Sequence, residues 1–368
     1  MLSDSARFSS VEWLTPNLEP PPALRDFVSA EESTLGDAIA FPGLINSHDH
    51  LAFSCYSPTG SPPYLDFLAW SRDVQAKSEM IERIERIPYA VRVQFGVLKN
   101  LLWGVTVIAD HGGRQNCLSL PIAIMRHCTL HSPELEKWAS LKLRFGGSTI
   151  VAHLAEGVDD ASRERALALL RWNVASRPVV GVHCVSLRDA DFAKLAALVW
   201  CPASNFFLFG RTADIAQAAA HTRVLFGTDS PLSAPGTIWD HIRTARAYFS
   251  GEALLSSLTA EAAHFWGLPD SRAADNFVIA RRRAASAWDS FYAITPSDIL
   301  LVVHDGSPAL IDSRLVEEIM LPGFEAVTCE GTCKYVKMPL NAMLEAVRSA
   351  APDFDCDALL ERFCTGAL

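Results

Sequence analysis

The stretch Phe41-Pro-Gly-Leu-Ile-Asn-Ser-His48-Asp-His50 joins a short apolar run to two closely spaced histidines. The apolar part is typical of a strand that enters a buried core. Because alternate side chains of an extended chain point to the same side, His48 and His50 should project together from the end of this strand. Neutral imidazole is a preferred ligand of zinc and similar cations, so the pair indicates a metal site. A pair of surface-loop histidines is the alternative, and these two residues alone do not exclude it.

The composition of the chain suits a large globular protein. It has 368 residues, of which 49% are hydrophobic and 20% charged, enough for one large α/β domain with an appendage or for two ordinary domains. The net charge of -10 argues against a nucleic-acid partner, and the triplet Arg281-Arg282-Arg283 is too short for a binding patch. No apolar run is long enough to cross a membrane, and the first seven residues lack the layout of a signal peptide.

The nine cysteines are dispersed through the chain. Several of them, such as Cys128, Cys184 and Cys201, fall in expected core strands. The odd count and the dispersion predict a reduced, cytoplasmic protein. Cys329 and Cys333 are close in sequence, but no second pair follows to complete a zinc site, so we interpret them as structural.

From residue 148 onward, short apolar runs alternate with helical segments. Strands are expected at 149–153, 178–183, 198–202 and 223–229, and helices at 161–174, 189–198, 213–220 and 239–249. This alternation predicts parallel βαβ units, and the apolar strands are typical of a sheet covered on both faces. Each strand ends in a polar residue, at the edge where a (β/α)₈ TIM-type barrel carries its chemistry. An open doubly wound sheet is the rival, but no Gly-rich phosphate loop follows the first strand.

The first half of the barrel is expected to be irregular. One long amphipathic helix is predicted over 79–102, followed by a strand at 105–109. Only about forty residues then separate residues 110 and 149, where two βα units need roughly sixty. A strand is expected there only over 121–129, so we expect the barrel to be shortened at strands 3 and 4.

The two ends of the chain are predicted to build a satellite β-sheet. We assign residues 1–40 and 276–338 to a small β-sandwich-like appendage and residues 41–275 to the barrel. Residues 339–368 are expected to form a C-terminal helical tail.

Several strand ends carry residues that suit metal chemistry. Each has an ordinary alternative, since a histidine on an apolar strand is usually a core residue and Asp229 could cap a helix. Taken together, three histidines and one carboxylate form a credible site for one divalent cation. Lys137 and Lys142 fall in an expected helix at 132–144, and neither ends a strand, as a carboxylated lysine that bridges two metals would. A second metal is therefore disfavoured. The residues concerned are His48, His50, His153, Glu156, His183 and Asp229.

Five motifs in this order resemble the amidohydrolase superfamily, and more closely its cytosine deaminase and triazine (chloro)hydrolase branch. The motifs are His48-Asp-His50, His153-Leu-Ala-Glu156-Gly, Gly181-Val-His183-Cys-Val, Cys201-Pro-Ala-Ser-Asn205 and Gly227-Thr-Asp229-Ser. Their order and the strand–helix context around them match the family from about residue 36 to 280. The resemblance implies one Zn²⁺ ion, or Fe²⁺ in its place, bound by His48, His50, His153 and Asp229. It also implies that Glu156 and His183 stand over the substrate.

This resemblance implies a hydrolase that acts on non-peptide C–N bonds. A bound metal lowers the pKa of water, Asp229 and Glu156 can carry its protons, and His183 can stabilise developing charge. Hydrolytic deamination of an amino-substituted heterocycle is the favoured reaction. Amide or C–Cl hydrolysis and a non-catalytic metal-binding homologue are the alternatives.

Residues after several strands are candidates for the wall of a substrate pocket, with ordinary packing as the equal alternative for each. Aromatic side chains suit a flat heterocycle, and Arg114 could favour an anionic group. The expected partner is a small molecule, without nucleic acid or membrane, and the chain could pair as a homodimer. The candidates are Tyr64, Phe67, Trp70, His111, Arg114, Phe206 and Trp239.

Overall fold

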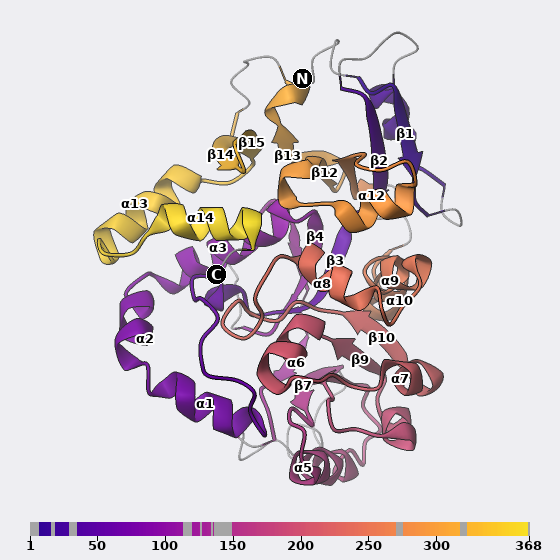
Figure 1. The fold of residues 1–368 in the computed structure, drawn as a ribbon, viewed down its shortest axis with the longest axis vertical. Coiled ribbons are helices and arrows are strands. Elements are labelled where there is room, and N and C mark those ends of the chain that lie inside the picture. Colours follow the sequence, from indigo (N-terminus) through magenta and orange to yellow (C-terminus); the bar gives the residue numbers. More distant parts are fainter. Residues whose placement is uncertain are drawn as a thin grey trace.

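The protein is described by a computed structural model over residues 7–15, 19–28, 35–112, 120–125, 127–133, 135, 149–269, 275–316 and 322–366. It has a mixed α/β fold in which parallel strands alternate along the chain with helices (Figure 1). A seven-stranded sheet lies above the parallel strands in this view, with the C-terminal helices beside it.

The parallel strands follow one another in chain order. One sheet has the order β3-β4-β5 and the other the order β10-β9-β8-β7-β6, and all neighbouring pairs are parallel. The parallel arrangement predicted from the apolar runs is therefore confirmed. The strands are β3 (Leu44–Asp49), β4 (Val105–Asp110), β5 (Ala123–Ile124), β6 (Cys128–Leu130), β7 (Ile150–Leu154), β8 (Val179–His183), β9 (Ala197–Trp200) and β10 (Arg223–Phe226).

The first and last of these strands meet at their carboxyl ends. The backbone N–H groups of Thr228 and Asp229 both donate to the carbonyl of His48, at 3.0 Å each. Between β5 and β6, no strand pairing joins the two sheets in the described part of the chain. The one strand expected over 121–129 is two short strands of two and three residues.

Helices and short 3₁₀ turns follow the parallel strands. In the described residues no helix is both long and apolar enough to cross a membrane. The expected helix at 189–198 is only the turn η3, and β9 begins within that range. The elements are η2 (Leu51–Phe53), α1 (Phe67–Gln75), α2 (Ser78–Glu85), α3 (Tyr89–Leu102), α5 (Asp160–Arg171), η3 (Asp189–Lys194), α6 (Pro202–Phe209), α7 (Ile215–His221), α8 (Ile238–Ala245), α9 (Gly251–Ser257) and α10 (Ala260–Trp266).

The single helix predicted over 79–102 is wrong in one respect, because it is divided into α2 and α3. Pro88 lies at the break and occupies the N-cap position of α3. Proline lacks a backbone N–H, and its ring disfavours a helical conformation of the preceding residue. The apolar spacing continues across this break, so periodicity alone could not reveal it.

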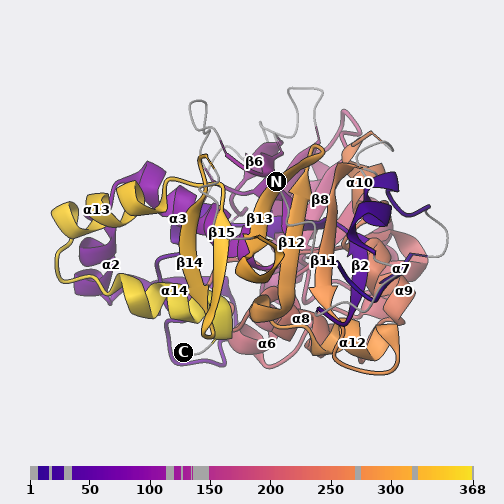
Figure 2. The ribbon, with the colours of Figure 1, turned by 90° about the horizontal axis from the view of Figure 1, so that it is seen from above.

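The satellite sheet predicted from the two chain ends is present and has the order β1-β2-β11-β12-β13-β15-β14. Figure 2 shows its central strands side by side. The N-terminal strand β2 pairs with β11, which follows the parallel strands in the chain, and β2 then leads directly into β3. The elements of this region are β1 (Ser10–Trp13), η1 (Pro22–Phe27), β2 (Asp37–Pro42), β11 (Phe277–Arg281), α12 (Ala287–Ala293), η4 (Pro296–Asp298), β12 (Ile299–His304), β13 (Ser307–Asp312), η5 (Ser313–Leu315), β14 (Glu325–Cys329) and β15 (Thr332–Val336).

The chain ends in two helices, α13 (Leu340–Ala350) and α14 (Cys356–Thr365), which pack beside α3. A disulfide between Cys329 and Cys364 ties β14 to α14, so the prediction of a fully reduced chain is wrong for this pair. The two cysteines are 35 residues apart, and only the fold brings their Cα atoms to 5.4 Å. Cys333, the expected companion of Cys329, is a free thiol.

Candidate metal-binding active site

Six predicted residues gather at the carboxyl ends of the parallel strands, and we call them the strand-end site. Two overlapping groups of three have ligand atoms that lie within 4.8 Å of one another. The first contains His48, His153 and His183, and the second contains His48, His50 and Asp229. Residues of β3, β7 and β8 and of the turn after β10 are thus brought together. The strand-end site consists of His48, His50, His153, Glu156, His183 and Asp229.

The ring nitrogens of three histidines converge on one point. The Nε2 atom of His153 lies 3.2 Å from Nε2 of His48 and 3.3 Å from Nε2 of His50. Asp229 closes the group, with Oδ1 3.8 Å from Nε2 of His48 and 3.6 Å from Nε2 of His50. Such a convergence of nitrogen and oxygen donors suits a tetrahedral divalent cation.

The surroundings keep these imidazoles neutral, as metal ligands must be. Burial lowers the pKa of His48 and His153 well below the usual value, and the neighbouring histidines lower it further. Burial also lowers the pKa of His50 to about 4, although Asp229 opposes this shift. Burial acts to raise the pKa of Asp229, but His183, His50 and two hydroxyl groups outweigh it, so the pKa is lowered. Three neutral imidazoles and one carboxylate therefore fit a zinc-type ion.

Hydrogen bonds orient two of the imidazole rings. The Nδ1 atom of His153 donates to the backbone carbonyl of His131, which leaves the lone pair of Nε2 to face the other histidines. In His183, Nδ1 donates to Oδ1 of Asn205 at 2.9 Å. We assign this direction because the Asn205 amide group already donates to Thr212 at 3.0 Å. Nε2 of His183 is therefore left to face the cavity.

Asp229 is held from three sides. Ser204 and Ser233 donate to its Oδ2 at 2.7 and 2.9 Å, and the backbone N–H of Ser230 donates to Oδ1 at 2.8 Å. The backbone of Asp229 has a φ of 61° and that of His183 a φ of 65°. Positive φ is uncommon for residues other than glycine, although Asp and His adopt it more readily than most, and it occurs often at functional sites. The local structure therefore fixes both side chains at some cost in conformational energy.

Glu156 and His183 lie together beside the converging nitrogens. The Oε1 atom of Glu156 is 3.7 Å from Nε2 of His183, and Oδ2 of Asp229 is also 3.7 Å from that nitrogen. Both residues are buried, with Glu156 8% exposed. The backbone carbonyl of Glu156 accepts from the N–H of Phe67 at 2.9 Å, so α1 begins directly over the site.

A cavity of about 280 Å³ opens over the strand-end site. Its far wall is apolar and partly aromatic, and its floor is formed by His50, His153, Glu156, His183 and Asp229. Ligand pockets usually measure about 300–1,000 Å³, so this cavity suits a small molecule. The apolar wall consists of Phe53, Phe67, Trp70, Val74, Leu135 and Leu232.

The structure places the predicted wall residues in different surroundings. Phe67 and Trp70 line the cavity, whereas Tyr64 is hydrogen-bonded to Asp73 outside it. Arg114, like Lys137 and Lys142, lies outside the described residues.

Three further wall candidates are not among the cavity-lining residues that the structure describes. Trp239 is fully buried and packs edge-on against Phe41, with ring centroids 5.9 Å apart, because its helix faces the core. Phe206, on α6, packs against Tyr248, with ring centroids 6.2 Å apart. His111 lies beside the histidines of the strand-end site, with its ring centroid 4.4 Å from that of His153.

Sequence reasoning gave no role to several residues that hold the site. Ser204 and Asn205 are part of the quoted motif Cys201-Pro-Ala-Ser-Asn205, and a signal for them was thus available. Ser233 lies four residues after Asp229, on the turn that follows β10. His131 lines the cavity, and only the fold shows that its carbonyl orients His153.

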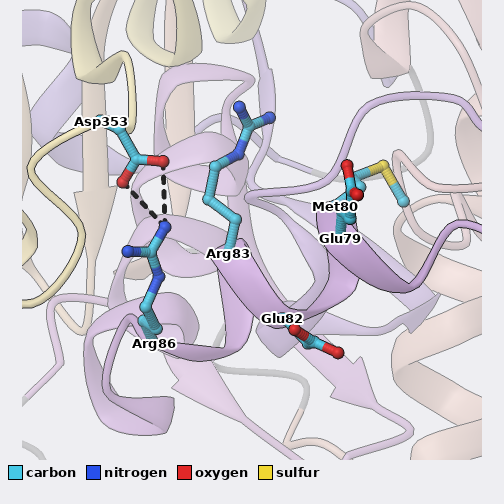
Figure 3. A pocket seen from close by; sticks show the side chains of 6 residues that line it. All are labelled: Glu79, Met80, Glu82, Arg83, Arg86 and Asp353. Atoms are coloured by element: carbon cyan, nitrogen blue, oxygen red, sulfur yellow. Dashed lines mark hydrogen bonds and ion pairs between the residues drawn. The ribbon is translucent and has the colours of Figure 1, made fainter.

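A second and larger hollow, of about 770 Å³, lies between α2 and the segment that joins α13 to α14 (Figure 3). An ion pair between Arg86 and Asp353, at 2.8 Å, spans it. Glu79, Glu82 and Arg83 also line it, so acidic and basic groups are mixed. Among its described lining residues are no histidines and no cluster that could bind a metal. Size alone therefore does not mark the functional cavity here.

Comparison with protein-family models gives no match for this chain, and comparison with the sequences of curated proteins gives none either. Solved structures do match. An adenosine deaminase from Xanthomonas campestris with bound zinc has a TM-score of 0.59 at 16% identity, over 87% of this chain and 88% of that chain.

Two further structures match over most of their length. Atrazine chlorohydrolase from Arthrobacter aurescens complexed with zinc has a TM-score of 0.59 at 16% identity, covering 88% of this chain and 92% of that chain. Helicobacter pylori aminofutalosine deaminase complexed with methylthio-coformycin has a TM-score of 0.56 at 13% identity, covering 74% and 87%.

These structural neighbours are members of the amidohydrolase superfamily. The resemblance stated from the five motifs is therefore confirmed at the level of the fold. At 13 to 17% identity the likeness concerns the fold alone, and the chemistry of this chain must be argued from its own residues.

Proposed function

We propose that this protein is a metal-dependent hydrolase of the amidohydrolase type that attacks a C–N bond with an activated water. Deamination of an amino-substituted heterocycle is the favoured reaction. One observation carries the proposal: three Nε2 atoms and a carboxylate converge below a cavity that Glu156 and His183 also face. The superfamily membership of the structural neighbours supports the same class of reaction.

In this proposal His48, His50, His153 and Asp229 hold one divalent ion, Zn²⁺ in preference to Fe²⁺. The ion would lower the pKa of a coordinated water towards neutrality. Structural neighbours with bound zinc support the choice of metal.

The side chains of the chain supply the remaining steps. Glu156 lies where a carboxylate can take a proton from water and deliver it to a ring nitrogen of the substrate. Protonation at that nitrogen makes the adjacent carbon more electrophilic. His183 donates from Nδ1 to Asn205, so the lone pair of its Nε2 can accept a hydrogen bond from the hydroxyl that adds to this carbon. Asp229 can carry a second proton, and its pKa is lowered, so it is ionised and able to accept one.

A hydrolase of amide or C–Cl bonds is the second candidate. The match to atrazine chlorohydrolase supports it, and Glu156 could equally protonate a leaving nitrogen. A non-catalytic metal-binding homologue has less support, because a structural metal needs neither Glu156 nor His183 at a cavity.

The finer architecture is also part of the proposal. We infer that the two parallel sheets form one (β/α)₈ barrel with short strands at β5 and β6, spanning residues 41–275. Residues 1–40 with 276–338 would form the appendage, and residues 339–368 the tail. A cytoplasmic location is supported by the six cysteines that are free among the described residues, although the Cys329–Cys364 disulfide counts against it.

The test combines metal analysis with a substrate panel. The protein purified without chelator should contain close to one equivalent of zinc or iron. The metal-replete enzyme should then release ammonia from aminated purines, pyrimidines, pterins or triazines, and form the carbonyl product. Release of carboxylate or halide with no ammonia would favour the second candidate. Absence of any bound metal would contradict both.

A further inference from the structure

A buried ion pair lies behind the histidines of the strand-end site. Asp49 stands between His48 and His50 in the chain, and alternation along the strand directs its side chain to the opposite face of β3. There its carboxylate lies 3.0 Å from Nζ of Lys99 on α3. The exposed fractions of the two side chains are 0% and 1%.

A close approach of α3 to the chain after His50 makes this contact geometrically feasible. At Gly96 an added Cβ would lie 2.5 Å from the carbonyl oxygen of Leu51, so no other residue fits without a shift. The next turn of α3 carries Lys99 and Asn100. The amide of Asn100 donates to Oδ2 of Asp49 at 2.7 Å and to the carbonyl of Gly96 at 2.9 Å.

Asn46 extends this set of contacts to the turn that carries Asp229. Its amide nitrogen lies 2.7 Å from Oγ1 of Thr228, 3.0 Å from Oδ1 of Asn100 and 3.2 Å from Oδ2 of Asp49. Its Oδ1 accepts from the backbone N–H of Thr228 at 3.1 Å. One connected network therefore joins α3, the end of β3 and the turn after β10.

Stability alone is a weak reason to keep two charges at this place. Removing a Lys–Asp pair from water costs several kcal/mol per ion, and well-packed apolar residues often replace buried pairs without loss. Hydrogen bonds behind metal ligands, in contrast, fix the orientation of those ligands. Through Oδ1 of Asn46, the network reaches the backbone N–H of His48 itself and that of Thr228, directly before Asp229.

We propose that Lys99, Asp49, Asn100 and Asn46 form a positioning unit that holds His48, His50 and Asp229 in the geometry that binds the metal. This inference rests on the proposed metal site and assigns a role to residues outside it. Lys99 is a positioning residue here, since it contacts Asp49 and not the ligand atoms.

The seven-stranded sheet offers a matched control. Lys334 and Asp312 form a second buried pair, 3.2 Å apart and both 0% exposed, on β15 and β13. The variants Lys99→Met and Lys334→Met each remove one buried ammonium group and leave one buried carboxylate. Both should lower stability, which thermal unfolding followed by circular dichroism measures.

The two variants should differ in metal binding. At a temperature where both are folded, zinc affinity is measured by competition with a chromophoric chelator. We expect Lys99→Met to bind zinc about 10- to 100-fold more weakly and Lys334→Met to bind it like the unaltered protein. The visible absorption spectrum of the Co²⁺-loaded protein should change only in Lys99→Met. Equal affinities and spectra in all three proteins, or equal losses in both variants, would overturn the inference.

If Lys99→Met does not fold, a second pair of variants with smaller changes tests the positioning unit. Thr228→Val removes the hydroxyl bonded to Asn46, whereas Thr106→Val removes a buried hydroxyl that has no hydrogen-bond partner. We expect weaker zinc binding only in Thr228→Val, and equal binding in both would overturn the inference. If the unaltered protein takes up no zinc, the proposed function itself fails and this inference with it. Normal zinc uptake with unaffected variants refutes the inference alone.

Discussion

The two buried Lys–Asp pairs of this chain have the same chemistry and very different neighbours. In the seven-stranded sheet, Lys334 also donates to the backbone carbonyl of Ser297 at 3.1 Å, and Asp312 accepts from Arg314 at 2.6 Å. These contacts hold strands and a turn together. At the strand-end site, Asp49 is bonded to residues that lead to the turn of Asp229.

This difference shows that burial and charge do not by themselves indicate function. Burial raises the pKa of both Asp49 and Asp312, although a lysine beside each acts in the opposite direction. Lys334 and Asp312 form hydrogen bonds with residues of the seven-stranded sheet region. Asp49, the partner of Lys99, is instead adjacent in the chain to His48 and His50, whose Nε2 atoms both point toward Nε2 of His153. The contacts made by neighbouring residues therefore distinguish the pair in the seven-stranded sheet from the pair beside the strand-end site.

The largest expected effect is a loss of bound metal when a histidine of the strand-end site is replaced. His50→Ala removes one of the converging nitrogens, so metal content should fall from about one equivalent to nearly none, and activity with it. His264→Ala is the control, because His264 is an exposed histidine on α10. Elemental analysis of both proteins measures the outcome. If His50→Ala retained a full equivalent of metal, the strand-end site would not be the metal site, and the contrast between the two Lys–Asp pairs would lose its basis.

The next effect is a loss of turnover while the metal stays bound. Glu156→Gln keeps the shape of the side chain and removes its ability to carry a proton. Turnover should therefore fall about 10²-fold or more while metal content is unchanged. Steady-state kinetics on the identified substrate, with metal analysis of the same preparation, measure both quantities. Full turnover in this variant would assign the proton transfer to another group.

Much of the strand-end site could be predicted from the sequence because each member ends an apolar run. His153, His183 and Asp229 lie at the same edge of parallel strands, and the βα rhythm is sufficient to bring them together. The satellite sheet could be predicted only in outline, since the pairing of β2 with β11 joins segments far apart in the sequence.

The parts that sequence reasoning missed depend on contacts without a local signal. Trp239 resembles a pocket residue in the sequence, but the face of α8 that carries it packs on Phe41. Lys99 lies on an amphipathic helix, where a lysine normally faces solvent, and only the fold shows its partner Asp49. The Cys329–Cys364 pair is equally hidden, because connectivity cannot be deduced from the spacing of nine cysteines.

A smaller effect is expected from the disulfide in the sheet region. Cys329→Ser removes the link between β14 and α14 and should lower the free energy of unfolding by about 2–4 kcal/mol. Metal content and turnover should stay the same, because the link lies outside the strand-end site. Cys333→Ser is the control, since Cys333 is a free thiol on the neighbouring strand. Denaturant unfolding measures stability, and a loss of metal in Cys329→Ser would show that the two regions are coupled.

The smallest effect separates the acid sensitivity that one buried histidine outside the strand-end site causes from that of the strand-end histidines. His241 on α8 is 1% exposed, and its Nε2 donates to the carbonyl of Pro235 at 3.0 Å. Burial lowers its pKa to about 4 from 6.5, although the contact with Pro235 and the charge of Asp240 oppose this shift.

Between these two pH values the unfolded chain binds a proton at His241 that the folded chain does not. Stability should therefore fall as the pH decreases from 6.5, by about 2 kcal/mol at pH 5 from this residue alone. His241→Gln can keep the hydrogen bond to Pro235 but cannot titrate, so its stability should depend less on pH by that amount. Denaturant unfolding of both proteins at pH 7 and pH 5 measures the difference. Equal pH dependence in the two proteins would show that His241 does not contribute to the acid sensitivity, which would then come from other groups, such as the buried histidines of the strand-end site.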